Sequence, residues 1–178
     1  MRNLKVGKIE YLISGTDPEI ALAHVLGLAF IELQQLEFSI VSHLTGLSDD
    51  LSTTYDASFD VFASKTFGNL IREMNRHDFM KSLTTDMVAM KEKRDFFVHK
   101  FLFHRFGGEL TTDSEYEDLI KDAADLGNLF ANTRTKFMDF MLQNAPLMMF
   151  AAKRDSDTGE FIFVESEFSK RRNPSPND

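Results

Sequence analysis

The feature that most constrains the fold is a long apolar segment close to the start of the chain. Thr16 and Glu19 have the spacing of a capping box, and Pro18 between them is tolerated in a first helical turn. The apolar pattern continues to Leu44, and Gly46 is a natural stop. At about 1.5 Å per residue, such a helix would be roughly 40 Å long. Its first half is apolar nearly all round, which predicts burial on more than one side.

Further helical segments follow this one along the chain. Their apolar residues recur at spacings of three and four, and glycines, prolines or polar breaks mark several of their ends. The expected segments are 56–62 and 66–74 with a break at Ser64 or Lys65, then about 78–105 before Gly107-Gly108, then Ser114 (a capping box with Glu117) to a point before Pro146.

The pattern changes after residue 146, where two short apolar runs, 147–151 and 160–164, flank an Asp/Gly-rich turn. This is typical of a β-hairpin, which has to pack on the helices or on another chain because a lone hairpin is marginally stable. The predicted fold is therefore all-α, an up-and-down bundle of about four long helices with a small C-terminal β-hairpin appendage. We assign residues 1–145 to the bundle, 146–169 to the hairpin and 170–178 to a disordered tail.

Composition excludes several kinds of site. The 178 residues contain no cysteine, which rules out disulfides, zinc–thiolate sites and iron–sulfur clusters and fits a cytoplasmic location. No secretory signal is recognisable, and the longest apolar run, 20–31, falls short of the ~20 residues of a membrane span. The formal net charge of −8 argues against a surface built for non-specific binding of nucleic acid.

Common catalytic and metal-binding motifs are absent from the sequence. There is no glycine-rich phosphate loop, no HExxH and no ExxH pair of the type found in helical di-iron proteins. His24, His43 and His77 are far apart, which favours structural roles for them. His99 and His104 are five residues apart with no matching set of carboxylates, so we expect neither a metal nor another cofactor.

One segment departs from the acidic character of the chain. Residues 91–105, KEKRDFFVHKFLFHR, hold five Lys and Arg residues against two acidic ones. A solvated edge of a core helix would produce the same excess. The alternative is a surface that attracts a polyanion, and the candidate RNA-binding residues are then Lys91, Lys93, Lys100, His104 and Arg105. His104 and Arg105 would also be favourable simply as charges at a helix C-terminus.

The same segment contains Arg94-Asp95-Phe96-Phe97-Val98-His99, an R-x4-H motif with a polar residue after the arginine. It lies in the third of the expected long helices and resembles the R-x4-6-H motif of the HEPN superfamily. The stretch 66–71, TFGNLI, is also similar to one that often precedes the motif helix in such proteins. The resemblance covers about residues 16–143 and does not include the C-terminal hairpin.

This resemblance implies a metal-independent endoribonuclease that leaves a 2′,3′-cyclic phosphate. It also implies a homodimer with a composite site, of the type that serves as a toxin with an antitoxin or regulatory partner, or as a phage-defence effector. The expected catalytic residues are Arg94, His99 and Asp95.

The residue types suit this chemistry. A histidine can take or give a proton close to neutral pH, and an arginine offers a permanently charged planar fork to a phosphate. Five residues advance a helix by ~500°, so Arg94 and His99 are separated by ~140° around the axis. Asp95 is four residues before His99 and is the expected orienting group for the imidazole. Because one helix presents a splayed pair, two copies would complete one cleft.

Two other interpretations remain open from the sequence. In the first, Arg94 pairs with Asp95 or Glu92 at the surface of the bundle, His99 is a partly buried polar group, and the chain is a non-catalytic HEPN-like dimeric interaction protein. In the second, the basic segment grips the phosphate of a small ligand. Whether the chain is an enzyme is therefore undecided at this stage.

Overall fold

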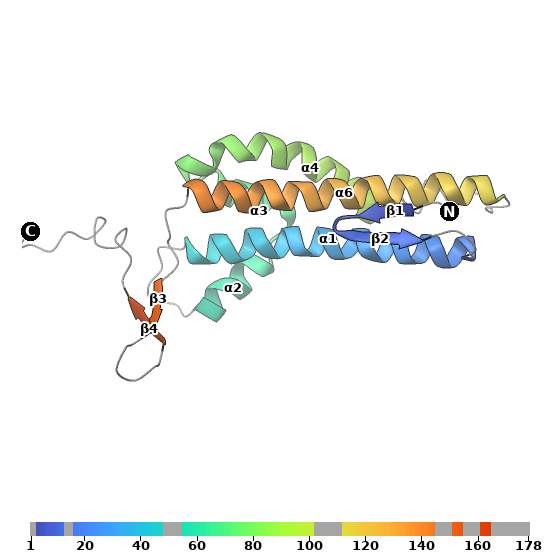
Figure 1. Cartoon of the computed structure of the whole chain (residues 1–178). Coiled ribbons are helices and arrows are strands. Elements are labelled where there is room, and N and C mark those ends of the chain that lie inside the picture. The colour runs from blue at the N-terminus through green and yellow to red at the C-terminus, as the bar shows by residue number, and fades with distance from the viewer. Residues whose placement is uncertain are drawn as a thin grey trace, which may run out of the picture.

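The computed structural model describes residues 3–12, 16–47, 55–101, 112–144, 151–154 and 161–164, and within these ranges the chain is mostly helical (Figure 1). The elements in chain order are β1 (Asn3–Val6), β2 (Ile9–Leu12), α1 (Pro18–Gly46), α2 (Tyr55–Ala63), α3 (Phe67–Met74), the 3-10 turn η1 (Asp78–Met80), α4 (Lys81–His99), α6 (Asp113–Asn144), β3 (Ala151–Arg154) and β4 (Phe161–Val164).

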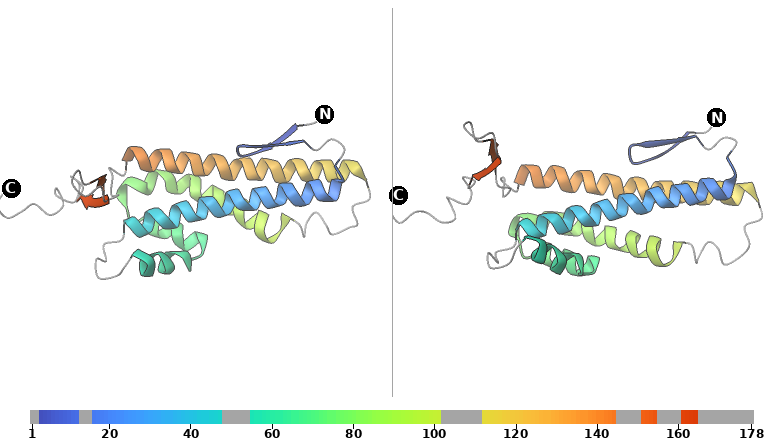
Figure 2. Two further views of the ribbon diagram at one scale, coloured as in Figure 1. Left: turned by 60° about the horizontal axis from the view of Figure 1, so that its bottom comes forward. Right: turned by 90° about the horizontal axis from the view of Figure 1, so that it is seen from below.

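The two longest helices, α1 and α6, lie side by side and run in the same direction (Figure 1). Helix α4 runs the opposite way, packs on α3 and α6 and meets α1 through the ion pair of Arg94 with Glu37, while the short helices α2 and α3 lie at the C-terminal end of α1 (Figures 1 and 2). The core lies between these helices, and its fully buried large side chains include Leu33, Leu36, Met87, Phe130 and Phe137. The expected helical bundle is therefore present.

The prediction of about four long helices is not confirmed. Among the described elements α1, α4 and α6 have 29, 19 and 32 residues, whereas α2 and α3 have only 9 and 8. The break between α2 and α3 falls where it was expected, and its cause is Thr66, whose hydroxyl accepts from the Asn69 backbone N–H at the start of α3. The expected third helix begins with the turn η1, but its α-helical part, α4, ends at His99 and not near Arg105, because the backbone at its C-cap residue, Lys100, leaves the helical conformation with a φ of −128°.

Two predicted helix starts are shifted by one or two residues. The cap of α1 is Asp17, whose carboxylate accepts from the Glu19 backbone N–H at 2.9 Å. The capping box of α6 is formed by Thr112 and Glu115, since the Thr112 backbone N–H donates to the Glu115 carboxylate at 3.0 Å and Glu115 N–H donates back at 3.4 Å. In both places a neighbouring polar residue provides the cap, so the expected helices exist with slightly different first turns.

An N-terminal hairpin that the sequence patterns did not reveal packs beside α1 and α6 (Figure 1). Strands β1 and β2 pair antiparallel, and the turn residue Gly7 has a φ of 61°, which favours glycine. The Gly7 N–H donates to Asn128 Oδ1 at 2.8 Å, and Asn128 Nδ2 donates to the Lys5 carbonyl at 2.7 Å. Val6 is fully buried against Gly127 of α6, so the hairpin is part of the core.

The predicted C-terminal hairpin is present as β3 and β4, which pair antiparallel from Ala151 opposite Val164 to Arg154 opposite Phe161. The second strand lies where it was expected, while the first begins at residue 151, where the predicted run ends. The remainder of the 146–169 segment and the expected tail, 170–178, lie outside the described residues.

Candidate functional site

Arg94 lies on the side of α4 that faces α1. Its Nε donates to Glu37 Oε1 at 3.0 Å, and its Nη1 donates to Asp95 Oδ1 at 3.2 Å. The Arg94 and Glu37 side chains are only 23% and 21% exposed, so this ion pair is half-buried between two helices. The interpretation of Arg94 as a charge that pairs with Asp95 is confirmed, and Glu37 of α1 is an additional partner.

Asp95 is bound by cations on both sides. Lys91, one turn earlier, donates to Asp95 Oδ2 at 2.5 Å, while Arg94 contacts the other carboxylate oxygen. The hydrogen bond from Lys91, with a smaller contribution from Arg94, lowers the pKa of the Asp95 carboxyl despite partial burial. The structure thus gives Asp95 partners other than the imidazole that it was expected to orient.

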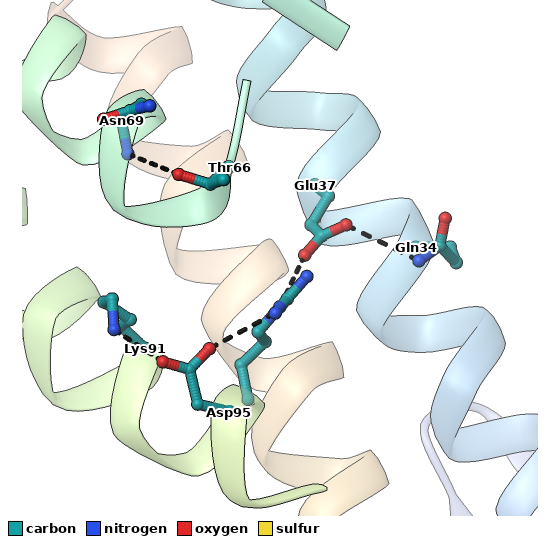
Figure 3. A network of polar contacts seen from close by, with 7 residues as sticks. Gln34, Glu37, Thr66, Asn69, Lys91 and Asp95 are labelled. Carbon is teal, nitrogen blue, oxygen red and sulfur yellow. Dashed lines mark hydrogen bonds and ion pairs between the residues drawn. The ribbon is translucent and has the colours of Figure 1, made fainter. Parts of the chain in front are cut away.

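These side chains belong to one polar network between α1 and α4. Glu37 also accepts from Gln34 Nε2 at 3.5 Å, which extends the network along α1 (Figure 3). Figure 3 shows Asp95 and Lys91 on α4 on one side of the network and Glu37 and Gln34 on α1 on the other. The network therefore connects α4, the helix that carries the R-x4-H motif, to α1.

A cavity of about 270 Å³ lies beside the network. Arg94 and Lys65 are its cationic lining residues, and Lys65 is paired with Glu73 at 2.6 Å. The rest of the lining comes from α1, α2 and α3: Gln34, Glu37, Phe38, Val41, Phe59, Ala63, Phe67 and Leu70. Arg94 is thus in the wall of an open, mostly apolar hollow.

His99 is the last residue of α4 and its side chain is exposed. No residue that the structure describes forms a hydrogen bond with its imidazole. His99 does not line the Arg94 cavity, as expected from the ~140° separation of the two residues around the helix. A single chain therefore does not bring Arg94 and His99 to one pocket.

The three RNA-binding candidates that the structure describes have different surroundings. Lys91 is paired with Asp95 near Gly68 of α3, whereas Lys93 lines a different cavity of about 290 Å³ between α4 and α6. Lys100 is exposed just after the end of α4. His104 and Arg105 lie outside the described residues.

Sequence reasoning missed the α1 side of this network. The signal was present, because Glu19, Glu32 and Glu37 are the only acidic residues of α1 and the helix has no Lys or Arg. Two isolated carboxylates in the apolar part of a helix require cations from elsewhere. Glu37 pairs with Arg94, and Glu32 lies 3.0 Å from Arg134 Nη2 in an ion pair without hydrogen-bond alignment.

No family model, curated protein or solved structure matches this chain. Of the helices that the structure describes, α1 has the length and apolar composition of a membrane span, and 39% of that window is buried inside the molecule. A core helix passes the same test, so this property does not locate the chain.

Proposed function

We propose that this chain is a metal-independent endoribonuclease of the HEPN type, acting in the cytoplasm as a homodimer in the manner of a toxin or phage-defence effector. The observation that carries the proposal is the placement of Arg94 and His99 on α4, the helix with the R-x4-H motif. Arg94 is held by Glu37 and Asp95 in the wall of a cavity, and His99 is exposed at the end of the same helix.

The proposed reaction uses the nucleophile that RNA itself carries. His99 of one copy, in its neutral form, takes the proton of a ribose 2′-OH, and the 2′-oxygen attacks the adjacent phosphorus. The bond from phosphorus to the 5′-oxygen breaks, and the departing oxygen takes a proton from the imidazolium of the second copy. The products are a 2′,3′-cyclic phosphate and a 5′-hydroxyl, and both histidines are restored by proton exchange with water.

Arg94 would stabilise the charge that accumulates on the phosphoryl oxygens during this attack. A guanidinium has five N–H donors, and the contacts with Glu37 and Asp95 use only its Nε and Nη1 groups. The two carboxylates fix the plane of the guanidinium, which limits the reorganisation needed when a phosphate binds. Their negative charge also weakens phosphate binding, and Lys91 offsets part of it.

The test is cleavage of single-stranded RNA in EDTA by the wild type and by the variants R94A and H99A. We expect both variants to lose at least about 100-fold in cleavage rate, in line with the loss of a phosphate ligand or a proton-transfer group. Arg72→Ala, on an exposed position of α3, is the matched control and retains activity. Retained cleavage in R94A and H99A, with folding verified by circular dichroism, would overturn the proposal.

One observation favours a second candidate, a non-catalytic HEPN-like interaction protein. Arg94 is already neutralised by two carboxylates, which is what a purely structural ion pair between helices requires. This candidate predicts self-association or binding to a regulatory protein without any cleavage of RNA. It also predicts that R94A loses more stability than E37Q, since R94A removes the contacts with both Glu37 and Asp95 and E37Q weakens only one of them.

A further inference from the structure

The face of α1 that points away from the core carries an unusual repeat. Six residues alternate at spacings of four and three along it, which is the pattern of the a and d positions of a coiled coil. We call this set the α1 seam: Ile20, His24, Gly27, Ile31, Gln34 and Phe38. All six are exposed, and the large apolar members Ile20, Ile31 and Phe38 are 52%, 51% and 62% exposed.

The α1 seam is also free of formal charge. Between Glu19 and Glu37 the only Asp, Glu, Lys or Arg residue is Glu32, which is 9% exposed and turned toward Arg134 of α6. Exposed apolar surface of this extent, without charges, is uncommon on a monomer and marks an interaction site.

The other described elements leave most of the α1 seam uncovered. Helix α2 approaches only its C-terminal end, where the rings of Phe38 and Phe59 are 5.6 Å apart, and Figure 2 shows α2 beside that end of α1. Within the described part of the chain, Ile20 and Ile31 stay about half exposed. At Gly27 an added Cβ would meet no atom within 4 Å, so there is room for a side chain from outside.

We propose that the α1 seam is the surface on which two copies of this chain associate, with the two α1 helices antiparallel about a two-fold axis between Gly27 and Ile31. This register makes the seam complementary to itself. Gly27 of each copy faces Ile31 of the other, so the isoleucine fills the space at the glycine. Ile20 faces Phe38, and His24 faces Gln34.

The self-complementary register favours a second copy as the occupant, and the lack of charge on the α1 seam limits the repulsion between two acidic copies. Each copy has a net charge of −8, so two copies associate most readily through a face that carries none. A parallel pair would place the acidic residues Asp17 and Glu19 of both copies together, whereas the antiparallel pair separates them. The same acidic residues disfavour an anionic lipid surface.

The exposed area is of the right order for such a contact. The large apolar members of the α1 seam, Ile20, Ile31 and Phe38, are each about half exposed or more. Roughly 100 Å² from each would supply more than a third of the ~800 Å² that a standard interface buries per partner. Their polar and small neighbours on the same face supply more.

The proposed pairing has a consequence for the motif helix, and this part rests on the proposed function. A two-fold axis that relates two antiparallel helices is perpendicular to the plane that contains both of them. A helix that packs on the flank of α1 in one copy therefore lies on the same face of the α1 pair as its equivalent in the other copy. Helix α4 packs on that flank through Arg94 and Glu37. Because α4 runs antiparallel to α1, His99 lies level with about residue 32, close to the axis. Both histidines would therefore face one shared cleft.

The interface is tested with Ile31→Lys, which places two buried like charges beside the axis. Leu142→Lys is the matched control, because Leu142 is an apolar residue of α6 that is 76% exposed and distant in sequence from the seam. We expect sedimentation equilibrium to give a dimer for the wild type and for L142K, and a dissociation constant raised at least about 100-fold for I31K. Circular dichroism should give the same fold for all three.

A second measurement uses the absence of cysteine from the chain. Gly27→Cys should be cross-linked to a covalent dimer by a short bis-maleimide, whereas Asp125→Cys, at an exposed position of α6, should not. A monomeric wild type, or a dimer that I31K leaves intact and G27C does not cross-link, would overturn the interface. Binding of the monomeric wild type to phosphatidylcholine vesicles would overturn it in favour of a lipid surface.

The two proposals fail in different ways. If I31K is monomeric and still cleaves RNA at the wild-type rate, the shared cleft is wrong although the interface is right. If the wild type is cross-linked through G27C but no RNA is cleaved, the interface is supported and the proposed ribonuclease activity is overturned.

Discussion

At the scale of single residues, a substitution of Glu37, the partner of Arg94, separates a catalytic from a structural role of Arg94. Glu37→Gln removes the charge of the partner but keeps an acceptor for Arg94. Since the pair is half-buried, we expect E37Q to lower the free energy of unfolding by about 1–2 kcal/mol, between the values for exposed and buried pairs. Urea denaturation measures this change. If the ribonuclease proposal holds, E37Q retains cleavage whereas R94A does not.

The matched control for E37Q is Asp78→Asn, which removes the partner of Lys81 in an exposed pair. Its effect on the free energy of unfolding should be much smaller than that of E37Q, because the pair is exposed to solvent. Equal losses in E37Q and D78N would mean that the Arg94 pair contributes no more than a surface contact.

The Asp95 carboxylate predicts a specific dependence on pH. Its pKa is lowered in the folded chain by the hydrogen bond from Lys91 and by Arg94, so its contribution to stability is present above the ordinary range of an aspartate, near 3.9. The contribution is lost as the pH falls through the lower, folded value. The difference in unfolding free energy between the wild type and Asp95→Asn should therefore be constant from pH 7 to 5 and shrink below about pH 4. A difference that stays unchanged down to pH 3 would contradict this assignment.

At the scale of elements, the close contact between α6, α1 and β1 is set by Gly127. A Cβ at this position would lie 2.6 Å from Val6 Cγ1 and 3.1 Å from the Ala29 Cα. We expect Gly127→Ala to destabilise the fold by about 1–3 kcal/mol, because backbone and buried side chains have to move. Gly46→Ala is the control, since a Cβ there meets nothing within 4 Å. Thermal denaturation compares the two variants. Similar melting temperatures would contradict the prediction, because they would show that the N-terminal hairpin can shift to accommodate the added methyl group without loss of stability.

The parts of the fold that follow from local pattern could be predicted, and those that depend on distant contacts could not. The extent of α1 was predictable because its apolar pattern is long and Gly46 ends it. The N-terminal hairpin was not, because its strands have four residues each and it is fixed by hydrogen bonds of Gly7 and Lys5 with Asn128, which is 121 residues after Gly7. The caps of α1 and α6 differ from the expected ones because several polar residues compete at each start.

The same reasoning applies to the candidate site. The motif and its ~140° separation were visible in the sequence, since both residues are on one helix. The pairing of Arg94 with Glu37 was not visible, because it joins residues 57 positions apart on two helices. The pairing of Arg94 with Asp95 was one of the interpretations open from the sequence, because the two residues are adjacent, and Lys91 binds the other oxygen of the same carboxylate.

At the scale of the whole molecule, the distribution of charge separates two surfaces. The chain is acidic overall, but the end of α4 carries Lys100 beside His99 and the α1 seam carries no charge. We propose that the first surface contacts RNA and the second another copy of the chain. In that arrangement, a splayed pair of residues on one helix would become part of a cleft that two copies share.

The measurement that tests the central claim most directly is the identity of the RNA ends produced in EDTA by the wild type, with H99A in parallel. We predict 2′,3′-cyclic phosphate and 5′-hydroxyl ends from the wild type and no such ends from H99A. Ends that carry a 3′-hydroxyl and a 5′-phosphate, or the same cyclic ends from H99A, would contradict the account.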